Sequence, residues 1–423
     1  MIPFVPSEVE GPAGVCLDYA RHERKRETEE AIALYVHWPF CVSKCPYCDF
    51  NSHVRAEIDA DVWRNALLAD LAHEAQLLPG RTLTSIFFGG GTPSLMDPRI
   101  VAALIDAACN HWTPSADLEI TLEANPNSVE AARFTDLAAA GVNRLSLGIQ
   151  SFDDDALRFL GRAHSASEGR DALDIAQRRF ERVSFDLIYA LPGDTQARWS
   201  AALEQALALG ATHVSLYQLT IEPGTRFATE VAAGRLTPLG PDRAADLYEL
   251  TGAMTAAAGL PAYEISNHAR RGHESRHNLT YWRYGDYAGI GPGAHGRRLG
   301  RRTMRHRKPE NFLSGTARNG HGLVEDERLS PTEAGDEALV MGLRLAEGID
   351  AGALAKRFSL TTIVDWKAVN RLVASGHMVQ DGTRIAATAH GRLLLDSVLG
   401  AIAAPQIPSA LAPILAATHS GST

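Results

Sequence analysis

Cysteine is scarce in this sequence, with five residues in 423, too few for a disulfide framework in a chain of this length. A net positive charge is also lacking, because 41 Lys and Arg residues face 50 Asp and Glu residues. Neutralising nucleic-acid phosphates requires a positive surface, so we expect no nucleic-acid partner. The fractions of hydrophobic residues, 45%, and charged residues, 22%, are ordinary for a globular chain. They exclude collagen-like, coiled-coil and wholly disordered classes.

Secretory and membrane signals are weak. The N-terminal residues, MIPFVPSEVEGPAGV, show no basic stretch followed by an apolar core, so we expect no secretory signal. The one long apolar run, 398–418, contains Pro405, Pro408 and Pro413, which a membrane-spanning helix would have to absorb. We therefore expect a cytoplasmic protein without a stable membrane span.

Short β-type runs alternate with amphipathic helical stretches from residue 33 to residue 259. The expected strands are 33–38, 84–89, 118–124, 144–150, 183–191 and 213–219, and the expected helices are 59–78, 98–111, 128–140, 167–180, 195–209 and 241–259. Ser128 and Ser167 are expected N-caps, and Gly141 and Gly210 expected helix stops. Parallel strands need crossovers, so this series predicts an α/β fold with a parallel sheet, either a partial (β/α)6 barrel or an open sheet.

The alternation stops after Tyr263, and a loop-rich stretch is expected to residue 310. Ser330, Pro331 and Glu333 then predict the start of a helix that reaches about residue 345. Helices near 350–358, 363–375 and 390–400, with a hairpin over 378–387, predict a mainly helical, winged-helix-like domain. The expected divisions are a weakly ordered extension (1–30), the barrel (31–262), a loop-rich site segment (263–325), the winged-helix-like domain (326–402) and a Pro/Ala-rich tail (403–423).

Three of the cysteines lie within eight residues, in a C-x3-C-x2-C pattern formed by Cys41, Cys45 and Cys48. They follow the first strand, and catalytic groups of parallel barrels lie at this end of the strands. Thiolates at this spacing can bind three corners of a [4Fe–4S] cube and leave one iron open to a small chelating molecule. A zinc site is the alternative, with His37 or His53 as fourth ligand. The two remaining cysteines, at positions 16 and 109, are expected to be bystanders.

Polar and glycine residues mark the ends of the following strands. Gly89, Gly90 and Gly91 end the second strand, where missing side chains let the backbone approach a ligand. Glu123 ends the third strand and could accept hydrogen bonds from an ammonium group or a ribose. Gln150 ends the fourth, and Asp186 lies within the fifth. Singly each is an ordinary polar residue, but together they line one rim of the sheet.

The cysteine pattern followed by Gly-Gly-Gly-Thr-Pro at 89–93 resembles the radical S-adenosylmethionine superfamily. In that superfamily the open iron binds the amino and carboxylate groups of the cofactor, and reductive cleavage of the sulfonium gives a 5′-deoxyadenosyl radical. The ordered motifs YVHWPFC, GGGTPS, EANP, GIQSFDD, LGRAHS, DLIYALPG and IGPGAHG are similar to the oxygen-independent coproporphyrinogen III oxidase family and its HemW-type heme chaperone branch. The similarity spans residues 33 to about 400.

The resemblance implies specific ligand contacts. The three clustered cysteines would hold a [4Fe–4S] cluster, and S-adenosylmethionine would contact Tyr35, Gly90, Glu123, Gln150, Arg162 and Asp186. Tyr47, Gly91 and Thr92 match positions around a second S-adenosylmethionine in the oxidase branch. No catalytic residue is assigned.

Two features favour the chaperone branch over the oxidase branch. The oxidase has a further cysteine two residues after the third, where this chain has Phe50, and it has a longer segment before its first strand. The second feature is the HNxxYW motif of His277, Asn278, Tyr281 and Trp282, which is associated with heme binding in HemW-type proteins. A neutral imidazole is a usual axial ligand of heme iron, and helical spacing would place His277 and Tyr281 on one face. A buried histidine with aromatic neighbours is the plainer interpretation of the motif.

We therefore predict a heme chaperone that binds heme, a [4Fe–4S] cluster and S-adenosylmethionine and passes heme to an acceptor protein. The alternative is an oxidase that decarboxylates coproporphyrinogen III, and a winged-helix nucleic-acid binder with a structural metal is a remote third. Whether the chain forms a homodimer is left open. The basic run 297–308, RRLGRRTMRHRK, is either a solvated loop or an anchor for porphyrin propionates.

Overall fold

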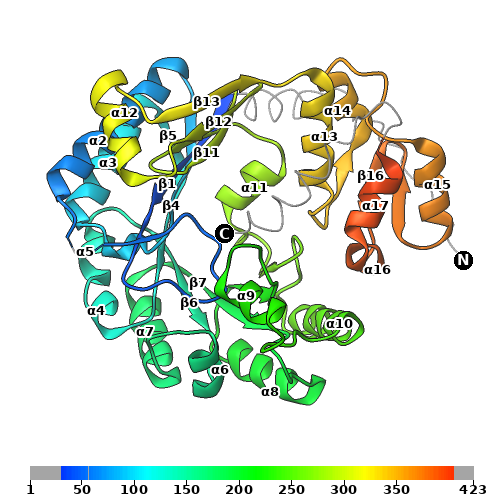
Figure 1. Cartoon of the computed structure of the whole chain (residues 1–423). Coiled ribbons are helices and arrows are strands. Elements are labelled where there is room, and N and C mark those ends of the chain that lie inside the picture. The colour runs from blue at the N-terminus through cyan, green and yellow to red at the C-terminus, as the bar shows by residue number, and fades with distance from the viewer. Residues whose placement is uncertain (1–29, 56, 404–423) are drawn as a thin grey trace, which may run out of the picture.

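The computed structural model describes residues 30–55 and 57–403, and its centre is an eleven-stranded sheet (Figure 1). The six predicted strands are present as β1 (Ala31–Trp38), β4 (Thr82–Gly90), β5 (Thr113–Ala124), β6 (Arg144–Gln150), β7 (Arg182–Tyr189) and β8 (His213–Gln218). They pair in this order, all parallel. The predicted partial barrel of parallel strands is therefore confirmed.

The barrel helices include the six predicted ranges, one of them divided in two, together with two helices and a 3-10 turn that were not predicted. They are α2 (Ala60–Leu77), α3 (Pro98–His111), α4 (Ser128–Ala131), α5 (Phe134–Ala139), α6 (Asp154–Phe159), α7 (Ala166–Arg179), α8 (Gln196–Leu207), α9 (Arg226–Ala232) and α10 (Pro241–Ala257), with the 3-10 turn η1 (Pro93–Leu95). The predicted N-caps Ser128 and Ser167 are wrong, because Asn127 caps α4 and Ser165 forms a capping box at the start of α7. The predicted stops Gly141 and Gly210 have the positive φ values of helix ends, +107° and +77°.

The segment after Tyr263 extends the sheet, so the prediction of a loop-rich stretch is wrong. β9 (Asn267–Ala269) pairs antiparallel with β8, and β10 (Tyr287–Ile290) adds a parallel strand beside β1. The antiparallel strands β11 (His295–Arg298), β12 (Arg301–Arg305) and β13 (Leu323–Arg328) continue the sheet from β10. Helices α11 (Arg276–Trp282) and α12 (Pro309–Asn319) connect these strands. The sequence pattern did not predict these strands because they are short, at three to six residues, and contain many residues that favour strands weakly.

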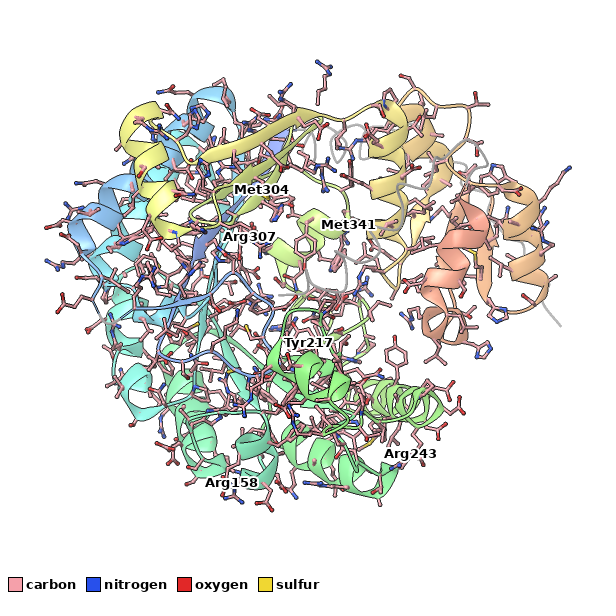
Figure 2. The ribbon with its side chains drawn as sticks, viewed as in Figure 1. Arg158, Tyr217, Arg243, Met304, Arg307 and Met341 are labelled. Carbon is pink, nitrogen blue, oxygen red and sulfur yellow. The ribbon has the colours of Figure 1, made fainter. Side chains whose placement is uncertain are left out.

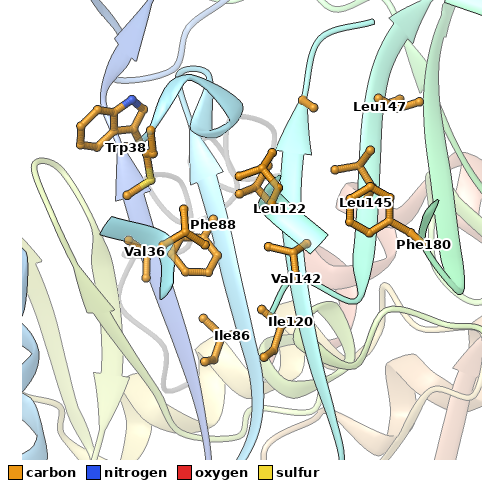
Figure 3. Packing of buried hydrophobic residues seen from close by; sticks show 14 of the residues in the cluster. Val36, Trp38, Ile86, Phe88, Ile120, Leu122, Val142, Leu145, Leu147 and Phe180 are labelled. Atoms are coloured by element: carbon orange, nitrogen blue, oxygen red, sulfur yellow. The ribbon is translucent and has the colours of Figure 1, made fainter. Parts of the chain in front are cut away.

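Side chains alternate along the barrel strands between the helix layer and the interior. Figure 3 shows buried apolar side chains of neighbouring strands packed with two residues that follow helices, Val142 and Phe180; the strand residues are Val36, Trp38, Ile86, Phe88, Ile120, Leu122, Leu145 and Leu147. The positions between them include the buried polar residues Ser85, Glu119, Thr121, Arg144 and Ser184. Because successive strand residues point to opposite faces, the apolar set packs on the helices and the polar set fills the barrel.

The C-terminal domain packs beside the barrel, on the right in Figure 1. Its helix α13 (Pro331–Gly342) begins with the predicted capping box of Ser330 and Glu333. It continues with α14 (Ala351–Arg357), α15 (Trp366–Ala374), α16 (Ala389–Leu393), α17 (Leu395–Ile402) and the three-stranded sheet of β14 (Ile349–Asp350), β16 (Arg384–Ala387) and β15 (Met378–Asp381). The predicted helices and hairpin are thus present around a separate hydrophobic core.

The predicted N-terminal extension, apart from Glu30, and nearly all of the predicted tail lie outside the described residues, as does Cys16. Within the described ranges no helix is long and apolar enough to cross a membrane.

Candidate functional site

A cavity of about 590 Å³ lies at the carboxyl ends of the parallel strands. Parallel strands end at one rim, so loops distant in sequence meet there. Eleven of the predicted site residues line it: Cys41, Cys45, Cys48, Tyr47, Gly90, Gly91, Thr92, Glu123, Gln150, Arg162 and Asp186. Tyr217, on β8, is a further wall residue and is labelled near the centre of Figure 2. The rim predicted from the strand ends therefore forms one site.

The three clustered cysteines occupy the loop that starts at β2 (Phe40–Cys41) and leads to β3 (His53–Val54). Thr92 Oγ1 donates a hydrogen bond to Cys41 Sγ, and Arg162 Nη1 donates one to Cys45 Sγ, each at 3.4 Å. Burial raises the pKa of Cys48 to about 11, with a further contribution from the neighbouring thiols. The thiols therefore have donors that stabilise sulfur charge but need a bound cation before all three ionise.

The donor set fits an iron–sulfur cluster better than zinc. His37 uses both ring nitrogens, because Nε2 donates to Asn51 O at 3.0 Å and Nδ1 accepts from the Tyr35 hydroxyl at 2.9 Å. His53 does not line the cavity. Among the described residues no group of three or more His, Cys, Asp and Glu side chains is placed to hold a metal ion. A [4Fe–4S] cube binds each thiolate through a different iron, so its ligands lie farther apart than those of a single zinc ion.

The glycines at the end of β4 allow close backbone packing. Gly90 has a φ of +113°, and a Cβ atom there would lie 2.7 Å from the ring of His37. A Cβ on Gly91 would lie 2.7 Å from the carbonyl oxygen of Phe40. A side chain at either position would displace His37 or the backbone of Phe40. Glycine at both positions lets the backbone at the end of β4 lie directly beside the cavity.

Two half-buried carboxyl groups line the cavity from β5 and β7, the strands on either side of β6. Burial, and then the nearby charge of Asp186, raises the pKa of Glu123 to about 8, against one backbone hydrogen bond from Gly90 N at 3.2 Å. Burial also raises the pKa of Asp186 to about 6, although hydrogen bonds from Ser215 and Ser146 oppose this. Ionising both carboxyl groups at the cavity wall is unfavourable without a cation, because burial removes water from them and their charges repel. The pair therefore suits a positively charged ligand.

Arg162 and Gln150 add directed polar groups to the same wall. Arg162 Nη2 donates to Asn125 Oδ1 at 2.5 Å and to Gly148 O at 2.8 Å. Gln150 has a φ of +68°, a strained conformation for a residue with a side chain, and its Oε1 atom is buried without a hydrogen-bond partner. An acceptor held in this way lacks only a donor from a ligand.

Tyr47, Gly91 and Thr92, matched to a second S-adenosylmethionine, also line the cavity. Tyr47 packs on Phe227 with ring centroids 6.4 Å apart, and burial raises its pKa. Thr92 is engaged by Cys41 and accepts a hydrogen bond from Asn125 Nδ2 at 3.2 Å. These contacts give Thr92 a role beside the cysteine loop and leave the second cofactor site a prediction.

The predicted heme ligand His277 and the predicted cofactor contact Tyr35 do not line the cavity. His277 is buried against the interior face of β4, where its ring stacks on Phe87 at a centroid distance of 4.9 Å. Its Nδ1 lies 3.3 Å from Ser85 Oγ, and burial lowers its pKa to about 3. The ring is therefore neutral, as iron ligation requires, but it is packed inside the barrel.

The other motif residues lie on α11 as helical spacing predicted. The rings of His277 and Tyr281 share one face, with centroids 6.0 Å apart. Asn278 Oδ1 and Trp282 Nε1 are buried without hydrogen-bond partners, and the guanidinium of Arg344 lies 4.7 Å from the Trp282 ring centroid. The motif therefore links the barrel to the C-terminal domain.

The basic run is not a solvated loop over residues 297–305, and its role as a propionate anchor stays a prediction. It forms β11 and β12, where the buried Arg298 and Arg305 pair with Glu74 at 2.6 Å and Arg305 also pairs with Asp70 at 3.3 Å. The remaining three arginines of this range are engaged by Tyr284, Asp326, Glu327 and Glu337. The acids come from distant segments, so the run alone gave no sign of this pairing.

The wall residues that sequence reasoning missed include Asn125, Tyr217 and Arg344. Asn125 lies within the EANP motif, and Tyr217 falls on the inward positions of β8 that alternation identifies. Arg344 follows α13, and no local pattern marks it.

Two family descriptions match the chain: "Radical SAM superfamily" over residues 35–206 and "HemN C-terminal domain" over residues 329–394. Radical S-adenosyl methionine domain-containing protein 1, mitochondrial, of Mus musculus is 40% identical over 380 residues, covering 87% of this chain and 86% of that protein. Heme chaperone HemW of Escherichia coli (strain K12) is 38% identical over 378 residues, covering 87% of this chain and 97% of that protein.

A solved structure gives the same result for the fold. Coproporphyrinogen III oxidase (HemN) from Escherichia coli, a radical SAM enzyme, superposes with a TM-score of 0.75 at 24% identity over 88% of this chain and 90% of that one. The predicted fold class is thereby confirmed. Given its similarity to HemW over nearly the full length of the Escherichia coli protein, the chain belongs to the HemW family of the radical SAM superfamily.

Proposed function

We propose that this protein is a heme chaperone that binds heme, a [4Fe–4S] cluster and S-adenosylmethionine and transfers heme to an acceptor protein. The observation that carries the proposal is its similarity to Heme chaperone HemW, at 38% identity over 97% of the Escherichia coli protein. Phe50, in place of the additional cysteine of the oxidase branch, supports the same choice. Clustered thiols suit a reducing compartment, so we propose a cytoplasmic location.

The chemistry of the cavity supports the two cofactors. Cys41, Cys45 and Cys48 would hold the cluster, with Thr92 and Arg162 donating hydrogen bonds to its thiolates. Glu123 and Asp186 would face the positive charge of S-adenosylmethionine, and Gln150 Oε1 would accept one of its donors. When bound, the two cofactors together supply one-electron chemistry.

His277 is our proposed axial heme ligand. Its lowered pKa keeps the imidazole neutral, and neutral imidazole is the form that binds iron. Because the ring stacks on Phe87 inside the barrel, ligation requires His277 or α11 to move away from β4.

Heme titration of the anaerobically reconstituted protein tests this function. We expect a shifted Soret band, and transfer of the bound heme to apomyoglobin as a model acceptor. His277→Ala should change the spectrum and weaken binding, whereas His268→Ala, which removes another buried histidine, should do neither. Absence of heme binding by the wild type would refute the chaperone function, and an unchanged spectrum of His277→Ala would remove His277 as ligand.

The second candidate function is oxidative decarboxylation of the propionates of coproporphyrinogen III. The cavity that gathers the cysteines, Glu123 and Asp186 favours it, because those groups suit a cofactor pair able to initiate radical chemistry. Incubation with coproporphyrinogen III, reductant and S-adenosylmethionine tests it. Conversion at enzymatic rates would replace the chaperone proposal.

A further inference from the structure

Arg344 connects the C-terminal domain to the cavity. It follows α13 and is one of the residues that line the cavity. Only 9% of the residue is exposed, and its Nε atom is buried without a hydrogen-bond partner. Across the part of the chain that the structure describes, no hydrogen bond or ion pair engages its guanidinium.

A buried guanidinium nitrogen without an acceptor is unusual, because its N–H group loses water on burial. Trp282 covers one face of the Arg344 guanidinium, but a ring stacked on the face does not accept the in-plane N–H groups. Arg298 and Arg305 show the usual solution in the same protein, since both are more deeply buried and both pair with Glu74.

The carboxylate that shares the surroundings of Arg344 is Glu264, since both influence the pKa of Tyr281. Glu264 Oε1 accepts hydrogen bonds from Ser266 N and from the backbone and side chain of Asn267, at 2.6–2.8 Å. No ion pair joins Glu264 to Arg344 in the described ranges, so Glu264 does not supply the missing acceptor. The in-plane donors of Arg344 remain available to a ligand in the cavity.

We propose that Arg344 binds a carboxylate group of the ligand that occupies this part of the cavity. A guanidinium matches a carboxylate with two parallel hydrogen bonds, and partial burial strengthens the pairing. Under the proposed function, on which this arm rests, the carboxylate is a heme propionate. The ring that Arg344 covers belongs to α11, the helix that carries His277, so the anchor and the candidate iron ligand share one element. The other source of a carboxylate is the methionyl group of S-adenosylmethionine.

Paired ligands that differ in this group test the proposal. Heme is compared with heme dimethyl ester, and S-adenosylmethionine with its decarboxylated analogue, by absorbance titration of the reconstituted protein. For a propionate anchor, Arg344→Met weakens heme binding about 10- to 100-fold and leaves the ester within about 2-fold. Arg344→Lys keeps the positive charge but lacks the planar guanidinium, so it loses part of the preference for the ligand with a free carboxylate. Arg371→Met, which removes an exposed arginine of the same domain, leaves the affinity for heme and for S-adenosylmethionine unchanged.

The outcomes distinguish the two sources of the carboxylate, and they distinguish failure of this proposal from failure of the proposed function. If Arg344→Met weakens S-adenosylmethionine but not the decarboxylated analogue, the bound carboxylate is the methionyl group. If neither ligand pair responds, the proposal is overturned. If the wild type binds S-adenosylmethionine but no heme, the proposed function fails, and the S-adenosylmethionine pair alone decides the role of Arg344. Should Arg344→Met lose its cluster absorbance or unfold, Arg344→Lys decides, and an unchanged preference for the carboxylate ligands in that variant overturns the proposal.

Discussion

The carboxyl group of Glu123 should couple binding of S-adenosylmethionine to the release of a proton. It lies near the end of β5, and burial followed by the nearby charge of Asp186 raises its pKa to about 8. A single backbone hydrogen bond, from Gly90 N, favours its ionised form. A cation bound beside it lowers the pKa, because the positive charge stabilises the carboxylate. The perturbation is a change of pH between 6 and 8, applied to the wild type and to Glu123→Gln.

The pKa of Glu123 sets both the number of protons released on binding and the change of affinity with pH. At pH 7 a carboxyl group with a pKa of about 8 is about nine-tenths protonated, so ligand binding to the ionised form releases about 0.9 proton. Binding then costs about 1.4 kcal/mol more for each pH unit below 8, a factor of about 10 in affinity. Affinity should therefore rise with pH to about 8 and level above it, with binding about 50-fold weaker at pH 6 than at pH 8, where half of the carboxyl groups are still protonated.

Calorimetry in buffers of different ionisation heat counts the released protons. The amino group of S-adenosylmethionine also titrates near this pH, but it does so equally with both proteins. The difference between wild type and Glu123→Gln isolates the carboxyl group and should be about 0.9 proton at pH 7. S-adenosylhomocysteine, which lacks the sulfonium charge, should show a smaller difference. Equal proton release by the two proteins would refute the coupling and would indicate that Glu123 does not meet the charge of the cofactor.

Three further predictions concern the cluster, the close packing at the strand end and the buried ion pairs. Cys45→Ser should lower the iron content and the cluster absorbance of the reconstituted protein, whereas Cys109→Ser should change neither, because position 109 is outside the cavity wall. Gly90→Ala should lower stability and cofactor affinity more than Gly210→Ala: both residues have positive φ, but only at position 90 does a Cβ atom meet the His37 ring. Glu74→Gln should cost about 3–5 kcal/mol in the free energy of unfolding measured with urea, because it removes the carboxylate between two buried arginines.

Each of these has a contradicting result. Normal iron content in Cys45→Ser would show that the cluster is held elsewhere. Equal losses in the two glycine variants would mean that backbone strain, and not the approach of His37, fixes the residue type. For the ion pairs, Asp61→Asn is the control, since Asp61 pairs with Arg64 on the exposed surface and should contribute at most about 1 kcal/mol. A loss that small in Glu74→Gln would show that the buried network adds little to stability.

The sequence alone determined the elements whose signals are local. The six barrel strands and the start of α13 follow from periodicity and capping, which depend on residues within one or two turns of each other. The cysteine loop and the rim of Gly90, Glu123, Gln150 and Asp186 were predictable for a related reason. Parallel strands bring their carboxyl ends together, so a residue at each strand end is enough to predict a shared site.

The tertiary structure decided what depends on partners distant in the chain. β10 to β12 are strands because β1 and β13 offer edges to pair with, and their own residues favour strands weakly. The basic run became an internal ion network because α2 presents Asp70 and Glu74 to it. Arg344, by contrast, reaches the cavity wall with no carboxylate paired to it in the described ranges. Arginines look alike in a sequence, and whether one stabilises the fold or awaits a ligand depends on the charges that folding brings beside it.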